Sequence, residues 1–85
     1  MRLDQLPFRQ AATVSAIDWA ALSDGDGKRL RNLGFDEGVE IESLHAAPWG
    51  KDPLAVRIGR MTVAVRRAQA HAVSVHVQRL DLAAE

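Results

Sequence analysis

Apolar side chains alternate with polar ones through most of the chain, which is the spacing of strands that bury one face. Four segments show this alternation, with apolar positions at Val39, Ile41 and Leu44; Leu54, Val56 and Ile58; Met61, Val63 and Val65; Val73, Val75 and Val77. A fifth segment, earlier in the chain, is apolar at Val14 and Ile17. We therefore predict five short strands, the first over Ala11–Trp19, where β-branched residues favour it. Gly59-Arg60 separates the third and fourth strands, and its leading glycine predicts a type II′ hairpin.

One segment has helical spacing instead. In Lys28–Leu33, the leucines Leu30 and Leu33 are three positions apart and so share one face. Asp24 or Asp26 is the expected N-cap, because a carboxylate can accept a hydrogen bond from an otherwise unpaired backbone N–H. We predict a short helix of two to three turns that is stable only when its leucines pack onto another element.

Glycines and prolines indicate where the elements end. Gly34 is expected in the left-handed position after the helix, with Phe35 covering the last turn in a Schellman-type stop. The segment Ala46–Pro53 contains two prolines and is predicted to be a loop. Single helical turns are expected at Leu3–Leu6, with both leucines turned inward, and at Arg67–His71.

Five short strands and one short helix predict an all-β domain. Five strands in a flat sheet with two wet faces would be unstable, whereas a curled sheet buries one face and removes most exposed edges. We therefore predict a small, partly open SH3-like barrel with the helix inserted after the first strand; an OB-type barrel is the main rival. Residues 1–85 are expected to form one domain, with a core over about 3–77 and a tail over 78–85.

Composition narrows the functional classes. The chain has 85 residues, 11 basic and 11 acidic residues and no cysteine. Zero net charge argues against a nucleic-acid-binding module, which normally carries a basic excess. The lack of cysteine removes disulfides, thiolate zinc sites and iron–sulfur clusters. No stretch reaches the roughly 18 apolar residues of a membrane span, and the N-terminus has no apolar signal core, so we expect a cytoplasmic protein without direct membrane insertion.

A search for catalytic and metal-binding motifs finds none. His45, His71 and His76 lie in different predicted elements and lack the i, i+4 spacing of a helical zinc pair, so we interpret them as surface residues without a metal. Gly25-Asp26-Gly27-Lys28 lacks the preceding strand and the glycine spacing of a phosphate loop. We expect neither an enzyme nor a bound cofactor.

Cationic and aromatic residues are the remaining candidates for binding. The segment between Leu54 and Ala70 has no acidic residue and contains four arginines: Arg57, Arg60, Arg66 and Arg67. Arg57 is expected to pair across strands with Glu40 or Glu42, and some of the others to contact an acidic partner. Trp49 is either an interface anchor or, in the favoured interpretation, a ring folded back over the open end of the barrel. Trp19 is interpreted as core or rim packing.

Three segments together resemble the FeoA family, which is named for ferrous iron transport. They are Leu30-x-x-Leu33-Gly34-Phe35-x-x-Gly38-x-x-Ile41, the proline-bounded loop from Pro48 to Pro53, and Val65-Arg66-Arg67-x-x-Ala70-x-x-Val73-x-Val75. The likeness runs from about Leu3 to Val77. Gln69 stands where the family's ending is usually acidic.

The resemblance implies an SH3-like barrel and a non-enzymatic cytoplasmic role beside FeoB, the membrane iron permease with a GTPase domain. We hypothesise that the helix Lys28–Leu33 and a neighbouring loop at Trp49 form the docking face. The candidate partner-binding residues are Arg29, Leu30, Leu33, Trp49, Arg66 and Arg67. A weak homo-oligomer remains open. The alternative function is a regulatory module, because the same barrel resembles the C-terminal domain of iron-dependent repressors.

Overall fold

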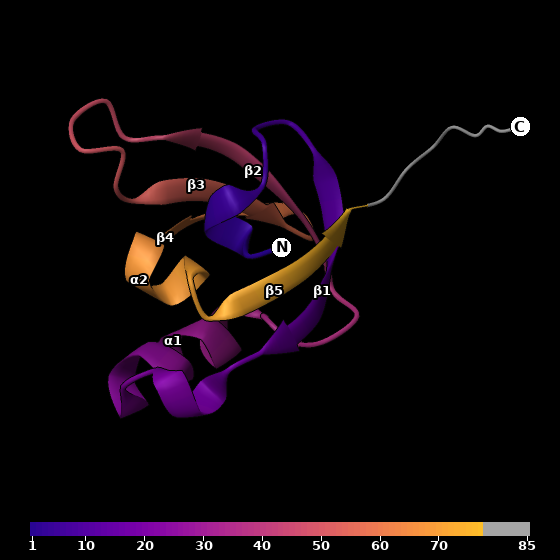
Figure 1. The fold of residues 1–85 in the computed structure, drawn as a ribbon, viewed down its shortest axis with the longest axis vertical. Helices are drawn as coiled ribbons and strands as arrows, with labels where there is room; N and C mark the ends of the chain where they lie inside the picture. Colours follow the sequence, from indigo (N-terminus) through magenta and orange to yellow (C-terminus); the bar gives the residue numbers. More distant parts are fainter. Residues whose placement is uncertain (78–85) are drawn as a thin grey trace, which may run out of the picture.

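Five antiparallel strands form one sheet in the order β4-β3-β2-β1-β5 (Figure 1). The structure is a computed structural model, and it describes residues 1–77. The strands are β1 Ala11–Ile17, β2 Glu40–Ala46, β3 Leu54–Ile58, β4 Met61–Val65 and β5 Val73–Val77; the helices are η1 Leu3–Gln5, η2 Trp19–Ala21, α1 Asp24–Leu33 and α2 Arg67–Ala70. Within residues 1–77, β4 and β5 are the two outer strands and do not pair. The predicted all-β class and open sheet are confirmed, and the expected tail at 78–85 lies outside the described residues.

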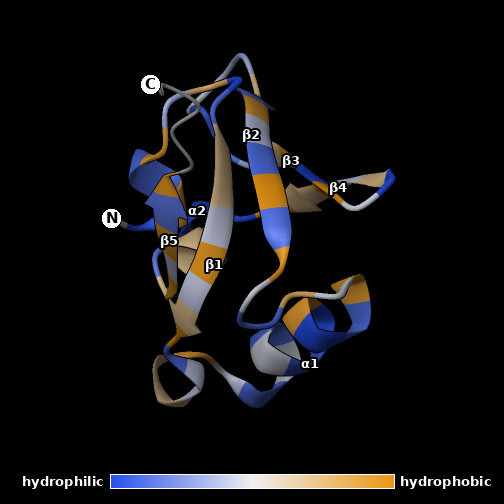
Figure 2. Cartoon of the chain, turned by 90° about the vertical axis from the view of Figure 1, so that its right-hand side faces the viewer, coloured by the Kyte–Doolittle hydropathy of each residue, from blue (hydrophilic) through white to orange (hydrophobic). Residues whose placement is uncertain are grey.

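The alternating pattern places one face of the curved sheet in the core. Figure 2 shows the alternation as successive orange and blue bands along β2. The buried apolar residues contributed by the sheet are Ala12, Val14, Ile17, Ile41, Leu54, Val56, Ile58, Val65, Val73 and Val75. Leu3 and Leu6 from the N-terminal turn, Leu30 and Phe35 from the α1 region and Ala70 from α2 complete this core. The predicted inward turn of both N-terminal leucines is therefore confirmed.

Helix α1 begins one turn earlier than its leucine spacing indicates. Its N-cap is Ser23, whose Oγ accepts from the backbone N–H of Asp26 at 3.1 Å, so the prediction of Asp24 or Asp26 as the cap is wrong. Ser23 has extended backbone, which leaves both aspartates inside the first turn, where the helix dipole favours negative charge.

The predicted stop of α1 is confirmed. Gly34 has a φ of 99°, its N–H donates to Arg31 O at 3.0 Å, and the N–H of Phe35 donates to Leu30 O at 3.0 Å. This pair of bonds is a Schellman motif, and the buried ring of Phe35 covers the last turn.

Three details of the strands differ from the prediction. β1 ends at Ile17, because Trp19–Ala21 forms a 3₁₀ turn. A bulge shifts the β2–β3 register between Ser43 and His45, and Ser43 is buried while Leu44 is only half-buried. Met61, next to the hairpin turn, is 51% exposed rather than buried.

The hairpin and the short helical turn after β4 follow the prediction. Ile58 pairs with Met61 across Gly59-Arg60, and Gly59 has a φ of 61° whereas Arg60 does not have positive φ, as a type II′ turn requires. Helix α2 occupies Arg67–Ala70. No helix within residues 1–77 is long and apolar enough to span a bilayer.

Candidate partner-binding surface

Helix α1 presents less apolar surface than its sequence indicates. Leu30 has no exposed surface and lies in the core, so it cannot contact a partner directly and its inclusion in the docking face is corrected. Leu33 is half-buried against the same core. Arg29 extends from the helix to the sheet, where its Nη2 donates to Ala64 O of β4 at 3.0 Å. The helix therefore uses its leucines for packing and an arginine to contact the edge of the sheet.

Trp49 projects into solvent. The residue is 87% exposed, so the favoured interpretation of a ring folded back over the barrel is wrong. The loop between β2 and β3 turns through Gly50 and Lys51, whose φ values are 73° and 56°. This turn leaves the indole on the outside of the loop, and Trp49 is the most exposed of the large hydrophobic residues of the described chain.

The two arginines after β4 have different environments. Arg67 holds the Trp49 loop: its Nε donates to Lys51 O at 2.6 Å and its backbone N–H to Asp52 Oδ1 at 3.0 Å. Arg66 is exposed; its backbone N–H donates to Gln69 Oε1 at 3.0 Å, and its backbone C=O accepts from the N–H of Ala70 at 2.9 Å. Arg57 pairs with Glu42 across strands, as predicted.

Helix α1 and the Trp49 loop do not form the single face that the sequence hypothesis assumed. Figures 1 and 2 share a vertical axis, and both place α1 at the bottom and the β2–β3 loop at the top. Helix α2 contacts both: Arg67 bonds the loop, and Gln69 Nε2 donates to Asp26 Oδ1 of α1 at 3.0 Å. The candidate residues therefore belong to two separate surfaces joined through α2.

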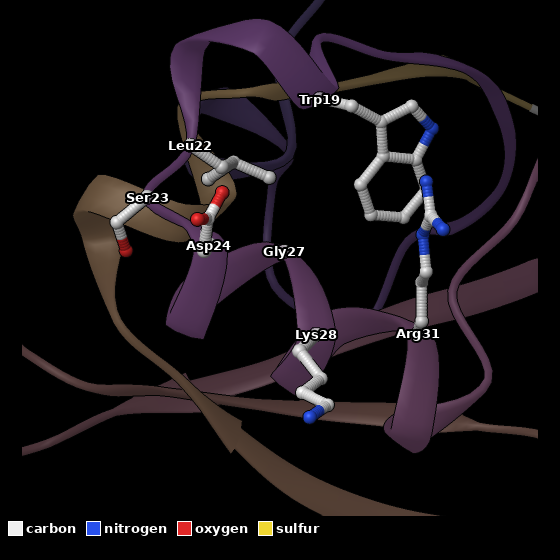
Figure 3. A pocket seen from close by; sticks show the side chains of 7 residues that line it. All are labelled: Trp19, Leu22, Ser23, Asp24, Gly27, Lys28 and Arg31. Carbon is white, nitrogen blue, oxygen red and sulfur yellow. The ribbon is translucent and has the colours of Figure 1, made fainter.

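A stacked cation and aromatic ring lie on the outer side of α1. Arg31 Cζ is 4.5 Å from the centroid of the Trp19 ring, close enough for a cation–π contact. Figure 3 shows the guanidinium against the indole, with Lys28 directed away from it. Two grooves flank the stack; one is lined by Trp19, Leu22, Ser23, Asp24, Gly27, Lys28 and Arg31. The predicted rim packing of Trp19 is confirmed, whereas sequence reasoning missed Arg31.

Two buried polar side chains were also missed. Gln69 is only 2% exposed, and its amide satisfies both a backbone N–H and a carboxylate of α1. The departure of Gln69 from the family's usual acidic residue is the one signal in the sequence that pointed to it. By contrast, the Ser43 hydroxyl is buried with no hydrogen-bond partner among the described residues.

The titratable groups are mostly solvent-facing. His45, His71 and His76 are all exposed, as predicted, and residues 1–77 contain no group of three or more His, Asp or Glu placed to hold a metal ion. Asp4 differs, because Arg2 lies 3.0 Å from one of its oxygens and His71 3.5 Å from the other. Burial alone would raise the pKa of Asp4, but the hydrogen bonds and charges of Arg2 and then His71 outweigh it and lower the pKa.

Residues 1–77 match a known family model, the one described as the FeoA domain. The chain belongs to the FeoA family. No curated protein sequence matches it. The family ties the chain to ferrous iron transport, in agreement with the predicted resemblance.

Solved structures support the same fold. FeoA of Stenotrophomonas maltophilia, described as a prokaryotic SH3 domain protein in complex with zinc, is 34% identical with a TM-score of 0.75, and the match covers 89% of each chain. Iron(II) transport protein A of Clostridium thermocellum is 28% identical with a TM-score of 0.79; the match covers 91% of this chain but 45% of that one. The manganese regulator SloR shares the fold at 10% identity, with a TM-score of 0.74 and coverage of 92% and 34%. The predicted SH3-like fold is confirmed.

Proposed function

We propose that this protein is a non-enzymatic accessory of a ferrous iron transport system, and that it acts in the cytoplasm by binding the FeoB GTPase-permease. The observation that carries the proposal is the FeoA family match over residues 1–77, which is all of the described chain. The S. maltophilia relative supports it, since its description raises a role as a bacterial ferrous iron transport activating factor.

The exposed tryptophan loop is the proposed contact with FeoB. Trp49 is 87% exposed, and tryptophan is enriched among the residues that dominate binding energy at protein interfaces. Arg66 lies exposed beyond β4, whereas Arg67 holds the loop through Lys51 O and Asp52. We assign contact roles to Trp49 and Arg66 and positioning roles to Arg67 and Leu33; in the free protein, Arg29 is held by Ala64 O of β4.

The test is direct binding of the full chain to FeoB purified in detergent, with and without guanine nucleotide. We expect saturable binding by the wild type and a loss of about 30-fold or more in affinity for Trp49→Ser, because central tryptophans contribute about 2 kcal/mol or more. Trp49→Phe is the matched control, since it keeps an aromatic ring, and it should retain most of the affinity. A wild-type chain that shows no binding to FeoB in either nucleotide state would overturn the proposal.

A further inference from the structure

The two outer strands of the sheet differ in whether another backbone segment covers their outer edge. At β5, the N-terminus covers the edge: Val75 N–H donates to Met1 O at 2.7 Å, and Arg2 forms an isolated antiparallel bridge with Ser74. At β4, no backbone segment within residues 1–77 pairs with the outer side. Natural sheets usually cover or interrupt such edges, because unpaired N–H and C=O groups recruit further strands. The open edge of β4 therefore requires an explanation.

The hairpin register shows which backbone groups point outward. Ile58 and Met61 flank a two-residue turn, so they form a hydrogen-bonded pair, and the pairs then alternate along the strands. Thr62 and Ala64 consequently direct their N–H and C=O groups away from β3. The bond from Arg29 to Ala64 O agrees with this assignment. The N–H and C=O of Thr62 and the N–H of Ala64 have no hydrogen-bond partner within the described residues.

Side chains beside this edge leave space for an added strand. Thr62 and Ala64 are small and exposed. A mainly apolar hollow lies next to them, lined among others by Ala55, Val63 and Pro53. Alternate side chains of an added strand would fall into this hollow, as in recognition by strand addition.

Charge indicates the chemistry of the occupant. Arg60 precedes β4 and Arg66 follows it, and neither guanidinium has an ion pair or side-chain hydrogen bond within residues 1–77. Two nearby arginines are engaged elsewhere: Arg57 pairs with Glu42, and Arg67 binds the Trp49 loop. An antiparallel pairing of two β4 edges would bring Arg60 of one copy opposite Arg66 of the other, which like-charge repulsion disfavours. An acidic segment that lies along β4 meets Arg60 at one end of the strand and Arg66 at the other.

We propose that the open edge of β4 binds an extended acidic segment of the transport partner, which adds to the sheet as a sixth strand. This inference rests on the proposed function. An incoming backbone N–H replaces Arg29 at Ala64 O, and the released guanidinium then pairs with a carboxylate of the segment. The segment's N–H and C=O groups bond to Thr62, which supplies affinity independent of the partner's side chains.

Thr62→Pro tests the proposal in binding to FeoB in detergent. Because the Thr62 N–H points away from β3, proline removes no bond of the hairpin, and edge strands tolerate it. We expect affinity to fall about tenfold or more, as the partner loses a donor and meets the proline ring. Thr62→Val is the matched control: it keeps the β-branched shape and the N–H, and it should bind like the wild type.

Amide exchange of the wild-type chain gives a readout that does not depend on any variant. In the free protein the amides of Thr62 and Ala64 should exchange quickly and that of Val63 slowly; with FeoB, the first two should become protected. Arg60→Glu should also lower affinity at low salt, with a smaller effect at high salt.

The outcomes separate the two proposals. If wild-type FeoB binding is absent, the proposed function fails. If the wild type binds while exchange at Thr62 and Ala64 is unchanged, or Thr62→Pro binds equally well, only strand addition is overturned. Self-association of the free chain that Thr62→Pro abolishes would make a second copy the occupant and would also overturn it.

Discussion

Replacing Gln69 with glutamate tests the contact that joins the two α-helices. Gln69 Nε2 donates to Asp26 Oδ1 at 3.0 Å, and the same amide accepts from the backbone N–H of Arg66. In Gln69→Glu an oxygen replaces the donor nitrogen, so a carboxylate would face the Asp26 carboxylate in a nearly buried site. The variant loses a hydrogen bond and gains a like-charge contact.

The cost can be bounded in two ways. Two like charges about 4 Å apart at an effective dielectric constant near 20 repel by about 4 kcal/mol. Protonating the introduced carboxylate instead costs about 3.7 kcal/mol at pH 7, from a reference pKa of about 4.3. We therefore expect Gln69→Glu to lower the free energy of unfolding by about 3–4 kcal/mol at pH 7, a large part of the roughly 5–15 kcal/mol of a typical domain.

The pH dependence has a defined sign. Burial beside the Asp26 carboxylate raises the folded-state pKa of the introduced carboxyl group above its unfolded value, so the folded variant binds the proton more tightly. The stability of the variant relative to wild type should fall as pH rises from about 4 toward 7. The penalty should be smallest below the unfolded pKa, where the introduced group is protonated in both states.

Urea unfolding followed by tryptophan fluorescence at pH values of about 4.5 and 7.5 measures this effect. Asp26→Asn is the control, because its amide oxygen can still accept from Gln69. In the double variant, the amide introduced at position 26 can donate to the carboxylate introduced at position 69, so we expect recovery of about 2 kcal/mol or more at the higher pH. Wild-type stability of Gln69→Glu at the higher pH, or a double variant no more stable than Gln69→Glu alone, would refute the reasoning.

Three further predictions concern the two helix glycines Gly34 and Gly27, the buried Ser43 and the carboxylate of Asp4. Gly34→Ala should lower the free energy of unfolding by about 1–2 kcal/mol, because a φ of 99° strains an L-residue. Gly27→Ala in α1 should raise it by up to about 1 kcal/mol, because alanine favours a helix more than glycine does. The added Cβ would lie 3.8 Å from Trp19 Cε3, which is an ordinary contact distance. Ser43→Ala should stabilise by about 1 kcal/mol, because it removes a buried hydroxyl without a partner among the described residues. Asp4→Asn should lower the free energy of unfolding by about 0.2–1 kcal/mol at pH 7. Because Arg2 and His71 lower the pKa of Asp4, this difference from wild type should vanish as pH falls through the folded-state pKa. Urea midpoints, measured across pH for Asp4→Asn, check all three.

Each of these has an outcome that contradicts it. Equal effects of alanine at Gly34 and Gly27 would mean that backbone conformation does not decide the cost. A destabilised Ser43→Ala would show that the hydroxyl has a partner in solution. A difference between wild type and Asp4→Asn that persists in acid would mean that the side chain acts through packing rather than through its charge.

The features that local sequence determined are those set by backbone sterics over a few residues. Gly34 and Phe35 specified the end of α1, because only glycine adopts the left-handed position without strain. Gly59-Arg60 specified the hairpin and its register, and the alternation before it specified the buried face of β3. The FeoA resemblance rests largely on residues of this kind, which is why fold and family could be predicted together.

The candidate surface depended on contacts between distant segments, which only the tertiary structure decided. Gln69 and Asp26 are 43 positions apart, and nothing local distinguishes a buried glutamine from an exposed one. Likewise, the Trp49 loop is held by Arg67, 16 positions beyond Lys51, and the N-terminus covers the edge of β5 rather than that of β4. Periodicity specifies which face of a strand is buried, but the partners that complete a sheet, a loop or a helix contact are chosen by the summed packing of the whole chain.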